Sequence, residues 1–350
     1  MTDRTDDLSA AGPTPYGDPR STAGCTTSRR RSVTLLLCAT AVVAVLVGAC
    51  SAAASPSPAA VASAAPTTAA SVAPSVAAAS PTLAPTPDAC AVANLKLIAP
   101  GKLTVGTNNP AYPPYFAAKD GGNTAPWDKD GGDPTTGKGF ESAVAYAVAD
   151  KLGFAPTDVA WIVVPFDNSY APGAKEFDFD INQVSYKPER AQTADLSDGY
   201  YFGNQSVVTL KSSKYAKATS IADFADASFG AQVGTTSLDA IAKIIKPTKD
   251  AQVYDSTDAA VEDLKNKTID AIVVDLPTAD YVTSVQVPGS VIVGQLDQGT
   301  PEHFSLVLGK GSPLTTCVNN AIAALTSDGT LKKLADQYLP FTTSTPVLKP

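Results

Sequence analysis

Short apolar runs alternate with longer mixed segments along the chain from about residue 100 onwards. The run FDFDI at 177–181 alternates aromatic and β-branched side chains with aspartates, which is typical of a half-buried strand. Segments with the composition of helices separate this run from similar ones, and this order predicts an α/β fold. The folded part, about residues 89–342, is long enough for two small domains or one large domain.

Polar side chains follow the strand predicted over 177–181. Asn182, Gln183 and Ser185 would lie at its carboxyl end, which is where open α/β sheets hold their ligands. Pro188 then begins a short helix that contains Arg190. A planar guanidinium at this place can clamp a carboxylate through two parallel hydrogen bonds.

The segment FDFDINQVSYKPERAQTADLSDGYY (177–201) resembles solute-binding protein family 3, the extracytoplasmic amino-acid receptors of ABC importers. The resemblance covers most of the chain from about Gly101 to Pro340 and rests on separate motifs in the family's order. These motifs are KLTVGTNNPAYPPYF (102–116), GKGFESAVAYAVADKLGF (137–154), FGAQVGTTSLDAIAKII (229–245), IDAIVVDLPTADYV (269–282) and TSDGTLKKLADQYLP (326–340).

The resemblance implies a two-lobed, periplasmic-binding-protein-like (type II) fold with two hinge strands. The runs GNQSVVTL (203–210) and HFSLVL (303–308) would be the paired hinge strands. Lobe one would comprise residues 89–204 and 302–342, lobe two residues 205–301, and residues 343–350 would form a C-terminal tail.

The segment 119–138 is longer than the family's usual hairpin and is rich in Gly, Asp and Pro, so it predicts an exposed loop. Trp127 within it is expected either to cover the ligand cleft or to pack on its own loop.

The resemblance implies that three groups bind the ligand's α-amino and α-carboxylate groups. Arg190 would bind the carboxylate together with the backbone N–H groups and hydroxyls at Thr235 and Thr236, and Asp275 would bind the ammonium. Structural alternatives remain open for all three. Arg190 can pair with Asp195 or Asp198, Thr236 can be only a helix cap, and Asp275 can cap the helix after Pro277.

The rest of the predicted pocket follows the family's aromatic and polar positions. Tyr112 and Phe166 match its aromatic positions, and either can instead belong to the core. The family's aspartate after the first strand is absent near Asn109, which counts against Arg, Lys or ornithine. Asn182 and Gln183 are bulkier than the usual serines, and their amides suit a polar neutral or acidic ligand.

The N-terminus predicts export and a lipid anchor. Arg29–Arg31 and an apolar run over 33–47 describe a secretory signal with a polar N-terminal extension, so residues 1–49 would be removed. Cys50 follows Gly48-Ala49 as in a bacterial lipobox and would be lipidated; an uncleaved signal-anchor is the alternative. Residues 50–88 carry the lipidated cysteine and an Ala/Ser/Pro/Thr tether too poor in large apolar side chains to fold. The body would lie outside the cell, anchored to the outer face of the bacterial cytoplasmic membrane.

Five cysteines separate by position. Cys25 and Cys38 leave with the signal and Cys50 takes lipid. Cys90 and Cys317 remain in an oxidising compartment, where one pairing is available, and two unpaired buried thiols are the alternative.

Charge and composition exclude several classes of function. The chain has a formal net charge of −8. Without residues 1–49, which hold five arginines and four aspartates, 21 basic and 30 acidic residues remain, a net charge of −9. Nucleic acid is therefore not an expected partner. A single histidine, His303, argues against a catalytic triad or a zinc site, so no metal, no cofactor and no enzymatic activity are expected. A dehydratase acting on cyclohexadienyl substrates is the enzyme alternative within the superfamily.

The sequence thus predicts a monomeric lipoprotein that binds an amino acid and delivers it to the transmembrane subunits of an ABC permease. The alternative from another class is the ligand-sensing ectodomain of a signalling partner. The chain ends at Pro350 without a second membrane segment, which disfavours that alternative.

Overall fold

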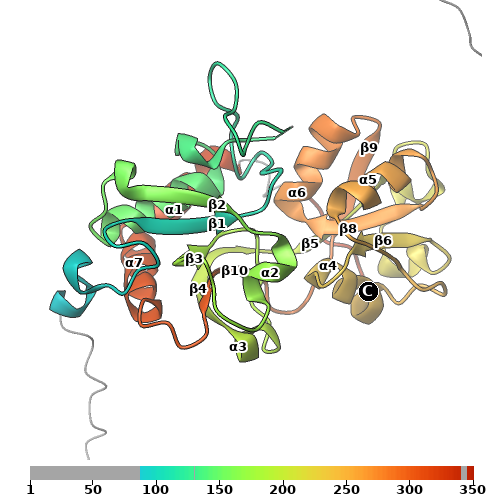
Figure 1. The fold of residues 1–350 in the computed structure, drawn as a ribbon. Helices are drawn as coiled ribbons and strands as arrows, with labels where there is room; N and C mark the ends of the chain where they lie inside the picture. Colours follow the sequence, from blue (N-terminus) through green and yellow to red (C-terminus); the bar gives the residue numbers. More distant parts are fainter. Residues whose placement is uncertain (1–86, 130, 340–344) are drawn as a thin grey trace, which may run out of the picture. The chain divides into compact units, whose positions relative to one another are not determined.

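The computed structural model describes residues 87–129, 131–339 and 345–350, and in this part of the chain the strands form two five-stranded sheets (Figure 1). The predicted signal, the predicted lipidation site Cys50 and the predicted tether up to residue 86 lie outside the described residues. Within them, no helix has the length and apolar character needed to cross a membrane.

The first sheet has the order β2-β1-β3-β10-β4. Strand β1 runs parallel to β2 and β3, whereas β10 is antiparallel to β3 and β4. We call the region around this sheet lobe one. Its strands are β1 (Leu103–Thr107), β2 (Val159–Val163), β3 (Phe179–Asp180), β4 (Ala194–Gly203) and β10 (Glu302–Gly309).

The second sheet has the order β7-β6-β8-β5-β9, and the region around it is lobe two. Strand β6 is parallel to β7 and β8, and β5 is antiparallel to β8 and β9. Its strands are β5 (Gln205–Leu210), β6 (Phe229–Gln232), β7 (Gln252–Tyr254), β8 (Ala271–Asp275) and β9 (Ser290–Gln295).

Helices cover both sheets and bury apolar clusters against them. In lobe one these are α1 (Phe140–Lys151), α2 (Phe166–Tyr170), α3 (Arg190–Thr193), α7 (Thr315–Ser327) and α8 (Thr330–Tyr338). In lobe two they are α4 (Thr236–Ala240), α5 (Thr257–Lys265) and α6 (Leu276–Tyr281), with π-helical turns at Ile241–Ile245 and Val282–Gln286. Short 3₁₀ turns occur at Pro87–Cys90, Val92–Asn94, Pro134–Thr136, Pro156–Asp158, Lys214–Lys217 and Ile221–Phe224.

The main core of lobe one lies between the sheet and α1, α7 and α8. Phe140, Val144 and Val148 of α1 are fully buried there together with Leu306 and Leu308 of β10. The opposite face of the sheet carries a smaller cluster around Val184, Ala194 and Val307, against which Phe166 and Tyr170 of α2 pack. Lobe two likewise has one apolar cluster on each face of its sheet.

The strand predicted over 177–181 forms, but its burial differs from the prediction. Only Phe179–Asp180 has strand geometry, and all five side chains of the run are buried instead of alternating. The reason is the position of β3 between β1 and β10, because a central strand with packed layers on both faces has no solvent side. The acidic-aromatic run after it is a strand of its own, β4.

The predicted pairing of the two hinge segments was wrong in detail. The run 205–210 belongs to lobe two and pairs with β8 and β9, whereas β10 pairs with β3 and β4. Near the point where the chain passes from lobe one to lobe two, the strands that pair are β4 and β10, and Gly203 lies opposite Glu302 there. Only Asn204 separates β4 from β5, so one extended segment passes from the first sheet to the second.

The segment 119–138 is only partly an exposed loop. Trp127 is 2% exposed and belongs to the main core of lobe one, so it neither covers the cleft nor packs only on its own loop. Gly132, Asp133 and Pro134 are also buried, because the backbone of this segment pairs with the chain near Ala111 and Ala117.

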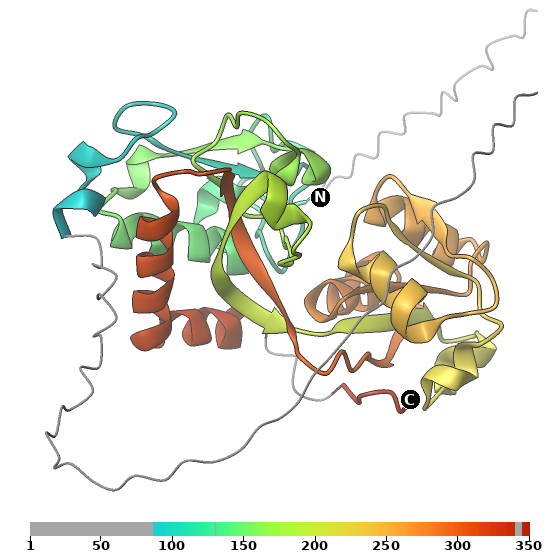
Figure 2. The same cartoon turned by 90° about the horizontal axis from the view of Figure 1, so that it is seen from below.

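Two features near the chain's ends tie distant segments together. Cys90 and Cys317, 227 residues apart, are joined as a disulfide. Residues 345–350, which the sequence analysis treats as a tail, lie against lobe two, where Val347 pairs with Gln295 and Lys349 with Ser220 (Figure 2). Leu348 is 3% exposed and completes a lobe-two core cluster.

Candidate ligand-binding cleft

One cleft with a volume of about 510 Å³ lies between residues of the two lobes, and its size suits a small-molecule ligand. All ten residues that the sequence predicts as ligand-binding line it. They are Asn109, Tyr112, Phe166, Asn182, Gln183, Ser185 and Arg190 from lobe one, and Thr235, Thr236 and Asp275 from lobe two. The structure therefore brings the whole predicted set together; that these residues bind a ligand stays a prediction.

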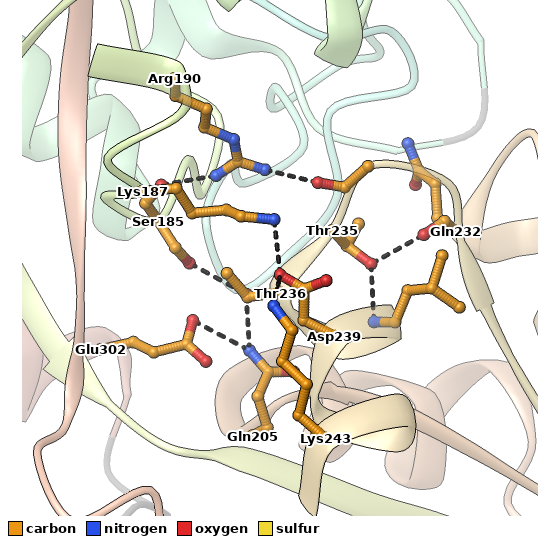
Figure 3. A network of polar contacts seen from close by, with 12 residues as sticks. Ser185, Lys187, Arg190, Gln205, Gln232, Thr235, Thr236, Asp239, Lys243 and Glu302 are labelled. Atoms are coloured by element: carbon orange, nitrogen blue, oxygen red, sulfur yellow. Dashed lines mark hydrogen bonds and ion pairs between the residues drawn. The ribbon is translucent and has the colours of Figure 1, made fainter. Parts of the chain in front are cut away.

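Arg190, the first residue of α3, is 4% exposed and lies where the lobes meet. Its guanidinium donates from Nη1 to the Ser185 carbonyl at 2.5 Å and from Nη2 to the Gly234 carbonyl of lobe two at 3.0 Å (Figure 3). Its Cζ lies 4.4 Å from the ring centroid of Tyr170. Burial lowers the pKa of Arg190, and a guanidinium still remains a cation at neutral pH.

The alternative partners considered for Arg190 are engaged elsewhere or lie apart from it. Asp195 pairs with Lys310 Nζ at 3.3 Å and accepts from Thr315 Oγ1. The ion pairs formed between described residues include none with Arg190. The guanidinium thus contacts carbonyl oxygens, aromatic rings and the Tyr170 hydroxyl, and it forms no ion pair within the described structure.

The turn before α4 assigns different roles to its two threonines. Thr235 is the N-cap, because its Oγ1 accepts from the Leu238 N–H at 3.2 Å. Thr236 is the first residue of the helix, and its Oγ1 lies 3.3 Å from Ser185 Oγ and from Gln205 Nε2. The capping alternative therefore applies to Thr235, which leaves Thr236 facing the cleft.

Asp275 ends β8 and occupies the N-cap position of α6, but its side chain makes no cap hydrogen bond. Its carboxylate instead accepts from Gln205 Nε2 at 2.8 Å. Burial, followed by the charge of Glu302, raises the pKa of Asp275 to about 7. A half-buried carboxylate with this pKa would be stabilised in its charged form by a ligand ammonium.

Gln205 is a residue of this site that the sequence analysis missed. Its Nε2 contacts Thr236 and Glu302 (Figure 3). The same Nε2 donates to Asp275, and its Oε1 accepts from Ser237 Oγ at 2.6 Å. It is 1% exposed, so these side chains are held in one arrangement by a buried amide. Its place at the very start of the apolar strand β5 was the available signal.

Contacts between the lobes surround the cleft. Tyr115 Oη lies 3.1 Å from Thr278 Oγ1, and Tyr112 Oη donates to Asp258 at 3.1 Å. Lys187 Nζ pairs with Asp239 of α4 at 2.6 Å. The two lobes are thus in direct hydrogen-bonded contact along both sides of Arg190 and Asp275.

The predicted aromatic residues have partners of their own within the cleft. The ring centroids of Tyr112 from lobe one and Tyr281 from lobe two lie 5.7 Å apart. Phe166 lies 5.4 Å from the Arg190 Cζ. Asn109 lines the cleft but donates its amide to the Pro126 carbonyl at 2.7 Å.

The charged side chains that line the cleft are unequal in sign. Asp167, Asp255, Asp258 and Asp275 face a single cation, Arg190, among the described lining residues. No group of three or more His, Cys, Asp or Glu side chains in the described part of the chain is arranged to hold a metal ion.

The family model and the individual relatives that match this chain point to the same family. The family described as bacterial extracellular solute-binding proteins, family 3, matches residues 103–341. The L-cystine-binding protein TcyJ of Escherichia coli (strain K12) is 28% identical over 249 residues, which cover 68% of this chain and 82% of that protein.

Two solved structures have the same fold. An ancestral arginine-binding protein bound to glutamine has 28% identity and a TM-score of 0.55, and the match covers 68% of this chain and 97% of that one. An ancestral amino-acid-binding protein, a precursor of cyclohexadienyl dehydratase, has 26% identity and a TM-score of 0.54, with 68% and 95% covered. The predicted two-lobed α/β fold is therefore confirmed.

Proposed function

The chain belongs to the bacterial extracellular solute-binding proteins of family 3, and from this premise we propose that it binds an amino acid between its lobes for an ABC importer. The observation that supports the proposal most is the placement of Arg190 and Asp275 in one cleft. An α-amino acid carries a carboxylate and an ammonium, and a buried guanidinium together with a half-buried carboxylate in the same cleft complements both. The relative TcyJ is an L-cystine-binding protein, and the ancestral relative was solved with glutamine.

Of the two ligand classes that the sequence predicts, a polar neutral amino acid suits the charges of the cleft better than an acidic one. The sequence left polar neutral and acidic ligands open. Four aspartates and one arginine line the cleft, so a second negative charge on the ligand would meet net repulsion. Among polar ligands this argument favours a neutral side chain over an acidic one.

The proposal includes a lipid anchor and delivery to a permease. Cys50 and the Ala/Ser/Pro/Thr tether would hold the body outside the cell, on the outer face of the cytoplasmic membrane. Mass spectrometry of the mature N-terminus tests the anchor, since a diacylglyceryl-modified Cys50 is expected. Loss of uptake of the bound amino acid on deletion of the gene tests delivery. Normal uptake would favour the sensor ectodomain instead.

An enzymatic alternative is kept because one structural relative is a precursor of cyclohexadienyl dehydratase. A turnover assay with prephenate-like substrates separates this alternative from a binding protein, and no product is expected.

Thermal-shift measurement with each of the twenty amino acids is the decisive experiment for binding. A ligand at 100 times its Kd adds about 2.7 kcal/mol to the free energy of unfolding. We expect such a shift with at least one polar neutral amino acid. If none of the twenty shifts the transition, the proposed function is wrong.

A further inference from the structure

A buried carboxylate lies directly behind the cleft. Glu141, in the first turn of α1, is 0% exposed and does not line the cleft. It accepts hydrogen bonds from the Tyr200 hydroxyl, from the Gln183 backbone N–H at 2.8 Å and from Gln183 Nε2. Two of its three hydrogen bonds thus go to one residue that does line the cleft.

Gln183 has a conformation that needs such support. Its φ is 49°, in the left-handed region that non-glycine residues seldom occupy. The bonds from its backbone and its side chain to Glu141 fix both parts of the residue at once. A buried acceptor with two oxygens can hold this geometry because both of its bonds are charge-assisted.

The direction of these bonds determines what Gln183 offers to a ligand. An amide has a donor end and an acceptor end, and which end faces which partner follows from the hydrogen-bond network. Above its burial-raised pKa of about 7, Glu141 is a carboxylate that only accepts, and it then takes the Nε2 end. The Oε1 end has no hydrogen-bond partner among the described residues and belongs to a side chain on the cleft wall.

We propose that Glu141 is a positioning residue that orients Gln183 so that the amide oxygen of Gln183 is presented to the ligand as an acceptor. The ligand selected is then an amino acid whose side chain donates a hydrogen bond to that oxygen. This inference rests on the proposed function, because it assumes that an amino acid occupies the cleft.

The test compares two ligands with neutral side chains, L-glutamine and the γ-methyl ester of L-glutamate, which is one methyl group larger. Both carry the carbonyl oxygen, but only glutamine has a side-chain N–H. Calorimetric titration of the wild-type protein should show that glutamine binds at least about tenfold tighter than the ester. The ester has no N–H to donate, so it leaves the Gln183 amide oxygen without a hydrogen bond.

Variants separate positioning from simple contact. In Glu141→Gln the new amide can donate to Gln183 Oε1, so the Gln183 amide can turn and the preference should fall to about threefold or less. Gln183→Met keeps the backbone bond to Glu141 but loses the acceptor, and it should lose the preference without a change in fold. Tyr200→Phe is the matched control, because it removes a donor to Glu141 and leaves both Gln183 contacts; its preference should stay within about threefold of the wild type.

The outcomes distinguish this inference from the function beneath it. Suppose that some amino acid binds but the wild-type protein does not prefer glutamine over the ester; the positioning role is then wrong and the proposed function stands. The same holds if Glu141→Gln or Gln183→Met retains the preference. A Tyr200→Phe variant that loses the preference also overturns it, because the effect would then be general disturbance around Glu141. If none of the twenty amino acids binds, both fail.

Discussion

At the residue scale, Arg190 and Asp275 are expected to be the two charges on which binding depends. Arg190→Ala and Asp275→Ala should each weaken binding at least about thirtyfold, because removing one partner of a desolvated pair costs about 2–5 kcal/mol. Calorimetric titration with the amino acid that gives the largest thermal shift measures this. The control is His303→Gln, since His303 lies on β10 between the rings of Tyr186 and Phe202 and does not line the cleft. A variant at Arg190 that binds normally would contradict the assignment.

The raised pKa of Asp275 predicts that the stability of the ligand-free protein depends on pH. Burial raises its pKa from 3.8 in the unfolded chain to about 7 in the folded one. Between about pH 4 and pH 7 the folded state therefore holds a proton that the unfolded state releases, so the stability from this group falls as the pH rises through that window. Burial raises the pKa of Glu141 to about 7 and acts in the same direction.

The measurement is the unfolding temperature of the ligand-free protein across this window, for the wild type and for Asp275→Asn. Asparagine keeps the acceptor for Gln205 but cannot titrate, so the fall in unfolding temperature with rising pH should be smaller in the variant. The charged and titratable groups coupled to Asp275 are the same in both proteins: Tyr115, Glu141, Arg190, Tyr201 and Glu302. Equal slopes in the two proteins would contradict the raised pKa of Asp275.

At the scale of elements, the sequence predicted which segments would meet better than how each would be buried. The strand before Asn182 and the helix at Arg190 were expected, because local composition and the family motif agree there. The full burial of β3 was not, since it results from neighbours on both sides that are far away in the chain. Gln205 and Glu141 were missed for the same reason, because their partners lie 70 and 42 residues away along the sequence.

The start of α1 depends on Gly139, which has φ 94° and ψ 158°, a conformation essentially restricted to glycine. A Cβ there would lie 2.5 Å from the Tyr115 carbonyl oxygen, the atom that accepts from the Glu141 and Ser142 N–H groups. Gly139→Ala should therefore both strain the backbone and push the cleft-lining loop away from α1.

Gly173→Ala is the matched control for this substitution. Gly173 has φ 114°, and a Cβ there would meet nothing within 4 Å, so the control carries the strain without the clash. We expect Gly139→Ala to lower the free energy of unfolding by about 1–3 kcal/mol more than Gly173→Ala, as overpacking does. Denaturant unfolding measures the difference. Equal effects would mean that the contact with Tyr115 is relieved at no cost.

At the scale of the whole molecule, the Cys90–Cys317 bridge joins the beginning of the described chain to α7. It closes a loop of 227 residues in sequence separation, for which chain-entropy estimates give about 5 kcal/mol of stabilisation. Non-reducing mass spectrometry of the mature protein should find one disulfide-linked peptide pair. The double variant Cys90→Ser/Cys317→Ser should unfold at a lower temperature and bind its ligand as before, because neither cysteine lines the cleft. Finding both thiols free would refute the bridge.

The last prediction concerns how binding is coupled to contact between the lobes. Asp239 of α4 pairs with two lysines, Lys187 from lobe one at 2.6 Å and Lys243 from its own lobe at 3.3 Å (Figure 3). Only the first pair requires the lobes to be in contact, so only it can shift the equilibrium between the joined and separated states. A partly exposed ion pair contributes about 0.2–1 kcal/mol, so Lys187→Ala should weaken ligand binding by about 1.4- to 5-fold.

Lys187→Ala should also raise the radius of gyration of the ligand-free protein in small-angle scattering, while saturating ligand restores the wild-type value. Lys243→Ala removes the same charge from the same carboxylate within one lobe, and it should change neither quantity. This comparison separates coupling from the general electrostatic effect of losing a lysine beside Asp239. Equal effects of the two substitutions, on affinity or on the radius, would show that the Lys187–Asp239 pair does not link the lobes energetically.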